Sequence, residues 1–246
     1  MKLYKYRDLS NPDNEAIARL ADILTHQAFW SADPKTLNDP EEFIWSSDYT
    51  PTGATLSLLT QVLVKTRGHA SAEARTLAEH AVLRNRLRPL AEPVFNLLVS
   101  RCRDELGLVC FGSTATNECL WQRYGGGGTG VCIELDVPSA LLNTQVHPVV
   151  YLPSKSLHID RVLEASLEPQ SVRHVYSVVL LSKPPQWAPE AELRFVSQRQ
   201  GLRVRLNGSH ISAIVMGRSL PESTRQGIQE LLNRLPYAPP LRPYEA

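Results

Sequence analysis

WAPEAELRF, residues 187–195, places Glu190, Glu192 and Arg194 at alternate positions. Side chains two positions apart lie on the same face of an extended strand, so these three are expected to share one face. The residues between them are apolar and share the opposite face, where they can pack against a core. The stretch therefore predicts a strand whose apolar face fixes a charged face in place.

Two carboxylates held side by side are suited to acid and base chemistry. Repulsion between like charges raises the pKa of one carboxyl, and a nearby arginine keeps the other ionised. The alternative is a solvated strand edge with salt bridges, each worth under about 1 kcal/mol. The sequence leaves both interpretations open.

The amino-acid composition is typical of a globular protein with a hydrophobic core. The chain has 246 residues, of which 43% are hydrophobic, and this is long enough to fold unaided. The formal net charge is +1, from 26 basic and 25 acidic residues, so no global field attracts nucleic acid or an anionic membrane. The near-neutral total charge is still compatible with a local basic groove.

No apolar run approaches the roughly 20 residues that a membrane span needs, and the start MKLYKYR lacks the apolar core of a signal peptide. We therefore expect a cytoplasmic protein without membrane contact. The cysteines have no C-x-x-C spacing and lie in segments that otherwise look buried, which favours reduced core thiols over disulfides or zinc. They are Cys102, Cys110, Cys119 and Cys132.

Periodicity predicts one α+β domain over residues 1–246, with a helical insertion at about 53–105. Strands are expected at 2–7, 28–31, 107–112, 131–136, 149–152, 202–206 and 211–217. Helices are expected at 14–25, before Tyr124, at 154–167 and at 221–235, while 175–181 fits either type. Arg88-Pro89 and Pro93 are expected to separate two helices, and the proline-rich tail to add no element.

The strand at 107–112 ends in hydroxyl residues, Ser113 and Thr114. A buried strand with a polar end is a good place for a site, since packing fixes the backbone while the tip stays open. The glycine run 125–130 precedes a strand instead of opening a helix, so it fails the context test of a nucleotide-binding loop. We interpret it as a connector.

Several blocks together resemble a bacterial family of domains of unknown function. They are YKYR at 4–7, FWSADPKTLNDPEE at 29–42, CFGS at 110–113, LWQRY at 120–124 with GVCIELD at 130–136, and WAPEAELRF. The resemblance spans nearly the whole chain, and ordered blocks are more specific than any one of them. Two departures stand out: CFGS replaces the family's C-F-S, which could displace the hydroxyl, and Arg123 stands where a histidine often precedes the tyrosine, which could remove a polar ligand contact.

More distantly, the order of arginine, hydroxyl and E-x-E resembles the R-S-E plan of ADP-ribosyltransferases, including toxins of bacterial defence systems. The resemblance implies a mixed, split β-sheet core and NAD as substrate. It implies that Arg7 binds the NAD phosphates, that Ser113 or Thr114 steadies the nicotinamide ribose, and that Glu192 stabilises the ribosyl cation. Glu190 would orient or activate a macromolecular acceptor, which is nucleic acid or protein.

Other residues complete this implied NAD site. Trp30, Trp121 or Tyr124 would stack on the adenine or nicotinamide ring, with core packing as the alternative for Trp121 and Tyr124. Arg194 would belong to the cofactor-binding set. No resident metal is expected in this interpretation.

Two other functions stay open. In a metal-dependent nuclease or phosphodiesterase, Asp39, Glu190 and Glu192 would bind Mg²⁺ and Arg194 would meet the phosphate. A non-catalytic domain would use the same pocket to bind a nucleotide or peptide.

Overall fold

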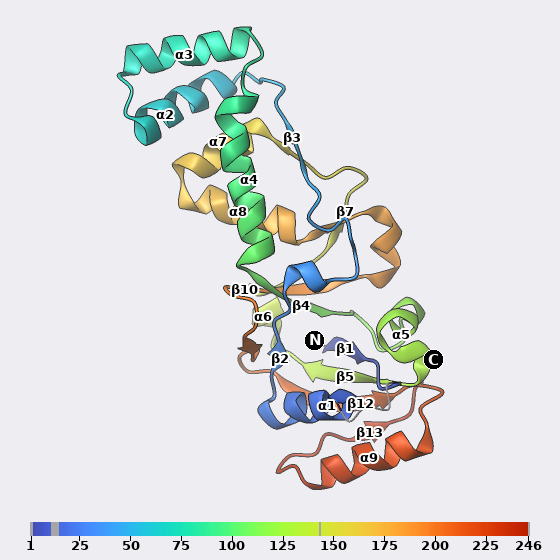
Figure 1. Ribbon diagram of the computed structural model, residues 1–246. Helices are drawn as coiled ribbons and strands as arrows, with labels where there is room; N and C mark the ends of the chain where they lie inside the picture. Colours follow the sequence, from blue (N-terminus) through green and yellow to red (C-terminus); the bar gives the residue numbers. More distant parts are fainter. Residues whose placement is uncertain (1, 11–14, 143, 246) are drawn as a thin grey trace. The chain divides into compact units, whose positions relative to one another are not determined.

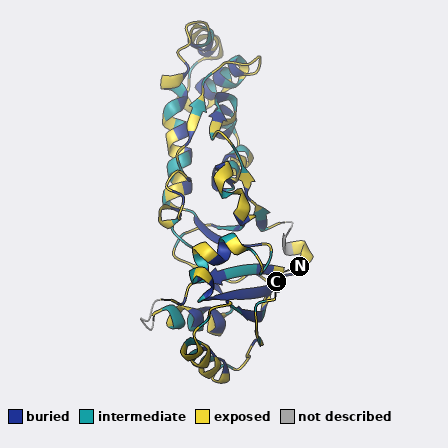
Figure 2. Ribbon diagram, turned by 90° about the vertical axis from the view of Figure 1, so that its right-hand side faces the viewer, coloured by how far each residue is buried: buried dark blue, intermediate teal, exposed yellow. Residues whose placement is uncertain are grey.

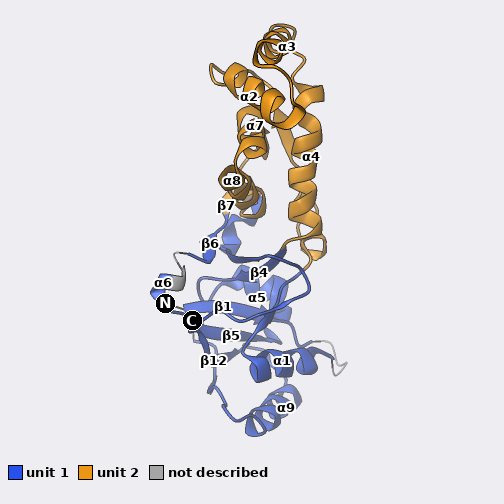
Figure 3. Cartoon of the chain, turned by 90° about the vertical axis from the view of Figure 1, so that its left-hand side faces the viewer, with its two compact units in different colours: residues 1–32, 107–149, 186–246 blue, residues 33–106, 150–185 orange. Residues whose placement is uncertain are grey.

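The computed structural model describes residues 2–10, 15–142 and 144–245, in two compact units (Figures 1 and 3). Unit 1 consists of residues 1–32, 107–149 and 186–246, and unit 2 of residues 33–106 and 150–185. The expectation of mixed helices and strands is confirmed, with several small sheets. The single folding domain stays a prediction, which the cooperativity of equilibrium unfolding tests.

Unit 1 contains a four-stranded sheet in the order β1 (Lys2–Arg7), β5 (Val131–Asp136), β12 (His210–Met216) and β13 (Leu241–Arg242). The first three strands are antiparallel, whereas β13 is parallel to β12. The prediction that the tail adds no element was wrong. The Ile214 amide donates to the Pro240 carbonyl at 2.9 Å, so a proline here supplies the acceptor and needs no N–H of its own.

A second sheet of unit 1 has the order β4 (Gly107–Phe111), β10 (Leu193–Ser197) and β6 (Val146–Pro148), all antiparallel. A two-stranded ribbon pairs β2 (Phe29–Trp30) with β11 (Arg203–Val204). The helical elements of this unit are α1 (Glu15–His26), α5 (Glu118–Tyr124), η2 (Gly126–Gly128), α6 (Ser139–Leu142), η3 (Pro185–Glu190, whose first residue belongs to unit 2) and α9 (Glu222–Asn233). The first residue of the helix expected at 14–25 lies outside the described residues.

The core of unit 1 forms where both sheets contribute apolar side chains. Leu3, Ile133 and Ile214 come from the first sheet, and Val109 and Phe111 come from β4. Buried residues dominate β5, whereas β1 mixes them with more exposed ones, and Figure 2 shows dark blue and teal together in this region. Helices α1 and α9 add side chains to the same cluster, so the charged residues of β1, β4 and β10 are attached to a packed scaffold.

Unit 2 is mainly helical. Its helices are η1 (Pro34–Thr36), α2 (Thr55–Arg67), α3 (Ser71–Leu83), α4 (Arg88–Asp104), α7 (Ile159–Leu167) and α8 (Pro169–Leu180). Its strand pairs are parallel: β3 (Ser46–Asp48) with β8 (Ser156–His158), and β7 (Val150–Tyr151) with β9 (Ser182–Lys183). The first part of the helix expected at 154–167 is therefore a strand, and the ambiguous run at 175–181 falls mostly in α8.

The break between α3 and α4 lies earlier than the prolines suggested. Residues 84–87 connect the two helices, Pro89 stands in the first turn of α4, and Pro93 lies inside it. The first turn of a helix tolerates proline because its N–H groups have no partner within the helix. The expected break at 88–93 was therefore placed a few residues too late.

Candidate functional site

Strands β1 and β4 of unit 1 meet at a bridge between Tyr4 and Gly112. The Tyr4 amide donates to the Gly112 carbonyl at 3.1 Å, and the Gly112 amide donates back at 2.7 Å. A Cβ on Gly112 would lie 2.6 Å from Leu120 Cδ1, so the extra glycine of CFGS makes room for the packing of α5. Ser113 follows this bridge and is exposed, so the departure from C-F-S leaves the hydroxyl at the end of the strand.

Lys5 reaches from β1 to β4. Its amine donates to the Cys110 carbonyl at 2.8 Å. The pKa of the Lys5 amine is lowered to about 8, mainly by burial and next by the Arg7 cation, while the negative charge of Glu192 opposes the shift. Burial likewise raises the pKa of the Cys110 thiol to about 12, with Glu192 as the next contribution. Lys5 thus interacts electrostatically with Arg7, Cys110 and Glu192.

Arg7 lies on the same face of β1 as Lys5, because both positions are odd in the strand. The side chain is partly exposed, but its Nε is buried and has no hydrogen-bond partner. Burial lowers the pKa of the Arg7 guanidinium, and the Arg19 cation adds to this. Among the described residues no carboxylate forms an ion pair with Arg7. A cation that is shielded from water and has no counter-ion among the described residues costs free energy, which makes Arg7 a candidate for binding an anion.

Glu192 lies immediately before β10, and Arg194 lies within this strand, directly opposite Cys110 on β4. Arg194 Nε donates to Glu192 Oε1 at 2.7 Å, and Arg194 Nη2 donates to Glu192 Oε2 at 3.2 Å. Arg194 is 0% exposed and Glu192 is 5% exposed. The pair is therefore bidentate and buried, a geometry that fixes the orientation of the carboxylate.

Glu190 does not belong to that strand, so the prediction of three charged residues on one strand face was wrong for it. Residues 185–190 form η3, and Ala191 has a φ of +44°, which turns the chain before β10 begins. A left-handed alanine costs about 1–2 kcal/mol. Strain of this kind concentrates at functional sites, and here it separates the two carboxylates.

Glu190 is 1% exposed and is held by α5. Arg123 Nη1 donates to Glu190 Oε1 at 3.0 Å, and the Tyr124 hydroxyl donates to the same oxygen at 3.1 Å. The Arg123 guanidinium carbon lies 4.3 Å from the centre of the Trp187 ring. Arg123, which stands where the family has a histidine, thus supplies an ion pair to the first carboxylate of E-x-E.

The remaining candidates from the sequence have structural partners. Trp121 is 3% exposed, its indole N–H donates to the Ala115 carbonyl at 2.8 Å, and its ring packs edge-on against Tyr6 at 5.1 Å. Trp121 is therefore packed in the core in this structure. The Thr114 carbonyl accepts from the Tyr6 hydroxyl at 2.6 Å, and the Thr114 hydroxyl pairs with Thr116 at 3.0 Å.

The glycine run is a tight turn between α5 and β5. Gly126, Gly127 and Gly128 have φ values of +61°, +63° and +97°, which only glycine adopts readily in succession. A Cβ on Gly130 would lie 2.0 Å from the Arg7 carbonyl oxygen. The turn therefore supports the backbone of Arg7, which is a structural use of the glycines.

Sequence reasoning missed Lys5, Cys110 and Arg123. The first had a signal, because Lys5 stands two positions before Arg7 in YKYR and so shares its face. Cys110 becomes relevant only through pairing with β10. The contact between Arg123 and Glu190 joins residues 67 positions apart, and no local pattern predicts it.

Within the described ranges, no group of three or more His, Cys, Asp and Glu side chains is arranged to hold a metal ion. Asp39, which the nuclease hypothesis combines with Glu190 and Glu192, belongs to unit 2, whereas those two belong to unit 1. All four cysteines are free. Of the helices described, none is long and apolar enough to cross a membrane.

Comparisons with known proteins give no relative. No protein-family model matches the chain, and neither a curated protein nor a solved structure matches it.

Proposed function

We propose that unit 1 is an ADP-ribosyltransferase-like enzyme that uses NAD, as the resemblance of its sequence implies. The observation that carries the proposal is Arg7, a largely buried guanidinium whose Nε has no acceptor and whose charge has no carboxylate partner among the described residues. The planar fork of arginine matches phosphate oxygens, so a pyrophosphate satisfies what the fold leaves unsatisfied. Lys5, on the same face, adds a second donor.

Glu192 is the residue that the resemblance assigns to the nicotinamide ribose. In the proposed reaction the bond between the nicotinamide nitrogen and the ribose C1′ breaks, its electron pair leaves with nicotinamide, and positive charge develops on the ribose. A fixed carboxylate stabilises such a charge. Arg194 acts as a positioning residue, since its two hydrogen bonds hold the Glu192 carboxylate in one orientation.

Glu190 takes the acceptor side of the reaction. The acceptor attacks C1′ and loses a proton, and a carboxylate held by Arg123 and Tyr124 can orient the attacking group. The acceptor is a macromolecule, nucleic acid or protein, and the setting is a bacterial toxin or defence system. These last points rest on the resemblance alone.

A second candidate is a nucleotide-binding domain without chemistry. The Glu192–Arg194 pair favours it, because both carboxylate oxygens already accept hydrogen bonds from the guanidinium. A carboxylate so engaged stabilises a ribosyl cation less than one that faces the substrate directly. In this case Arg7 and Lys5 bind the phosphates and no nicotinamide is released.

The two candidates separate in one assay. The full chain is incubated with NAD and bacterial extract, and released nicotinamide and ADP-ribosylated acceptors are measured for the wild type and Glu192→Gln. Glu134→Gln is the matched control, since Glu134 is also buried in unit 1 but pairs with Lys2 and Ser212. Turnover lost only in Glu192→Gln supports the enzyme. Binding of NAD without turnover in any variant supports the second candidate, and neither binding nor turnover overturns both.

A further inference from the structure

Unit 2 contains a pocket of about 340 Å³ that the proposed function does not use. It is lined by Tyr49, Thr50, Pro51, Val82 and Asn85. One wall is the segment between β3 and α2, and the other is the end of α3 with the turn that follows it. The volume falls in the range of small-ligand sites, and the lining combines an aromatic ring and apolar side chains with amide and hydroxyl groups.

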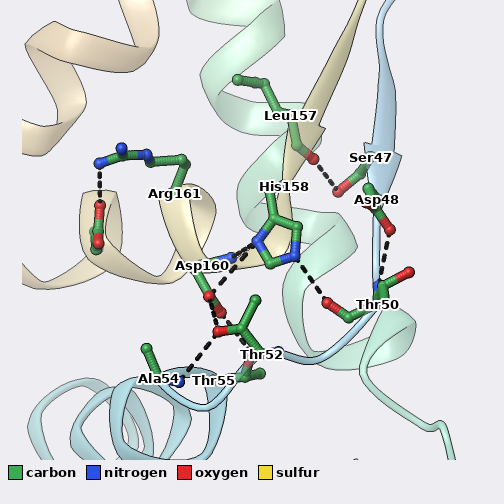
Figure 4. A network of polar contacts seen from close by, with 11 residues as sticks. Ser47, Asp48, Thr50, Thr52, Ala54, Thr55, Leu157, His158, Asp160 and Arg161 are labelled. Atoms are coloured by element: carbon green, nitrogen blue, oxygen red, sulfur yellow. Dashed lines mark hydrogen bonds and ion pairs between the residues drawn. The ribbon is translucent and has the colours of Figure 1, made fainter.

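The first wall is fixed by a polar network (Figure 4). His158 Nε2 donates to the Thr50 carbonyl at 2.8 Å, while His158 Nδ1 accepts from the Asp160 amide at 3.1 Å. Asp160 in turn accepts from the Thr52 and Thr55 hydroxyls at 2.5 and 2.6 Å. The backbone beside Tyr49 is thereby tied to the first turn of α7, so this wall of the pocket is held by contacts within the chain.

The second wall, Val82 and Asn85, belongs to a segment rich in arginine. Residues 84–88 read RNRLR, with three exposed arginines and no acid. Asn85 has a φ of +50°, a conformation that asparagine tolerates better than most residues, and it turns the chain at the pocket. The Arg88 guanidinium carbon lies 5.4 Å from the centre of the Tyr49 ring, so a cation and an aromatic ring meet at the rim.

Acidic neighbours do not cancel this charge. Glu92 is 3.9 Å from Arg88 at its closest ion-pair approach, and Glu79 is engaged with Arg75. Asp48, next to the opposite wall, accepts the Thr50 amide at 2.9 Å. This hydrogen bond lowers the pKa of the Asp48 carboxyl, which therefore stays ionised and faces its own loop. The segment 84–88 itself carries three arginines and no acid.

We propose that this pocket binds a nucleoside phosphate, with the base stacked on Tyr49 and the phosphate held by the arginines of 84–88. Aromatic platforms beside arginines bind bases of any sequence, because every base offers a π-face and the arginines contact phosphate. The ligand is either a free nucleotide or one unit of a single strand. The proposal is independent of NAD chemistry in unit 1.

The experiment uses the full chain carrying Arg7→Met, so that the site proposed in unit 1 does not contribute. Binding of AMP is followed by calorimetry, and binding of a short labelled oligothymidylate by fluorescence anisotropy. Tyr49→Ala is expected to weaken binding about tenfold, whereas Tyr49→Phe keeps the ring and keeps the affinity. Arg84→Ser with Arg86→Ser is expected to weaken binding and to reduce its salt dependence.

A matched control removes the same charge elsewhere on unit 2. Lys65→Ser with Arg67→Ser changes two exposed cations at the opposite end of the α2–α3 hairpin from the pocket. Affinity for AMP alone identifies a free-nucleotide site, and tighter binding of the oligonucleotide identifies a strand. The proposal is overturned if neither probe binds, or if the control pair weakens binding as much as the 84 and 86 pair. It is also overturned if Tyr49→Ala, shown to be folded by circular dichroism, binds as well as the wild type.

Discussion

Glu192 and Arg194, two residues apart at the start of β10, are joined by two hydrogen bonds and are almost completely buried. Breaking a buried pair leaves an uncompensated charge, which typically costs about 3–5 kcal/mol. We expect Arg194→Met to lower the free energy of unfolding by about this amount, measured by urea denaturation. Glu192→Leu combined with Arg194→Met should cost less than Arg194→Met alone. Equal stability of the single variant and the wild type would contradict the pairing.

Replacement of Arg7 should change the free energy of unfolding in the opposite direction. Because its guanidinium is largely shielded from water and has no counter-ion among the described residues, Arg7→Met removes a cost and should raise the free energy of unfolding by about 1 kcal/mol. Urea denaturation of this variant beside Arg194→Met gives two arginine-to-methionine changes with opposite expected signs. A loss of stability on Arg7→Met would show that the cation supports the fold, and the proposed phosphate site would lose its main observation.

Position 191 should accommodate glycine with less strain than the native alanine. Its φ of +44° strains any residue with a Cβ, so Ala191→Gly should stabilise the chain by about 1 kcal/mol, after the greater freedom of glycine in the unfolded state is counted. Ala188→Gly, three residues earlier in η3, is the control and should destabilise. Thermal unfolding measures both. Destabilisation by both glycines would mean that residue 191 is not strained.

Lys5 gives a pH dependence with a defined sign. Its pKa is about 8 in the folded protein against 10.5 ordinarily, so between these values the unfolded chain binds more protons than the folded one. Stability contributed by Lys5 is therefore lowest below pH 8 and rises as the pH increases from about 8 to 10.5. The difference in unfolding free energy between wild type and Lys5→Met should grow in favour of the wild type across this window. Lys2→Met is the control, because the pKa of Lys2 is raised. A flat difference for Lys5 would contradict the assignment.

The sequence predicted the scaffold of unit 1 better than its site. Alternation and apolar runs located β1, β4, β5 and β12, because these strands are buried in a core that demands apolar side chains at regular positions. Short elements such as β13 and β8 were missed, since two or three residues carry too little periodicity. The tail forms a strand because β12 offers hydrogen bonds to it, and that is a tertiary cause.

The site depended on contacts that local patterns do not contain. Period-two spacing placed Glu192 and Arg194 together correctly, since both belong to one extended segment. It failed for Glu190, because Ala191 adopts a left-handed conformation, which the presence of an alanine in a sequence does not predict. The partners of Glu190 come from α5, and Trp121, on the same helix, faces Tyr6 in the core.

The most direct measurement is calorimetric titration of ADP-ribose into the wild type and Arg7→Met. ADP-ribose carries the pyrophosphate without the reactive nicotinamide bond, so the titration tests binding apart from catalysis. We expect the wild type to bind with a stoichiometry that includes a site in unit 1, and Arg7→Met to lose that site while unfolding at an equal or higher denaturant concentration. Unchanged binding in Arg7→Met, or no binding by the wild type, would contradict the phosphate role of Arg7.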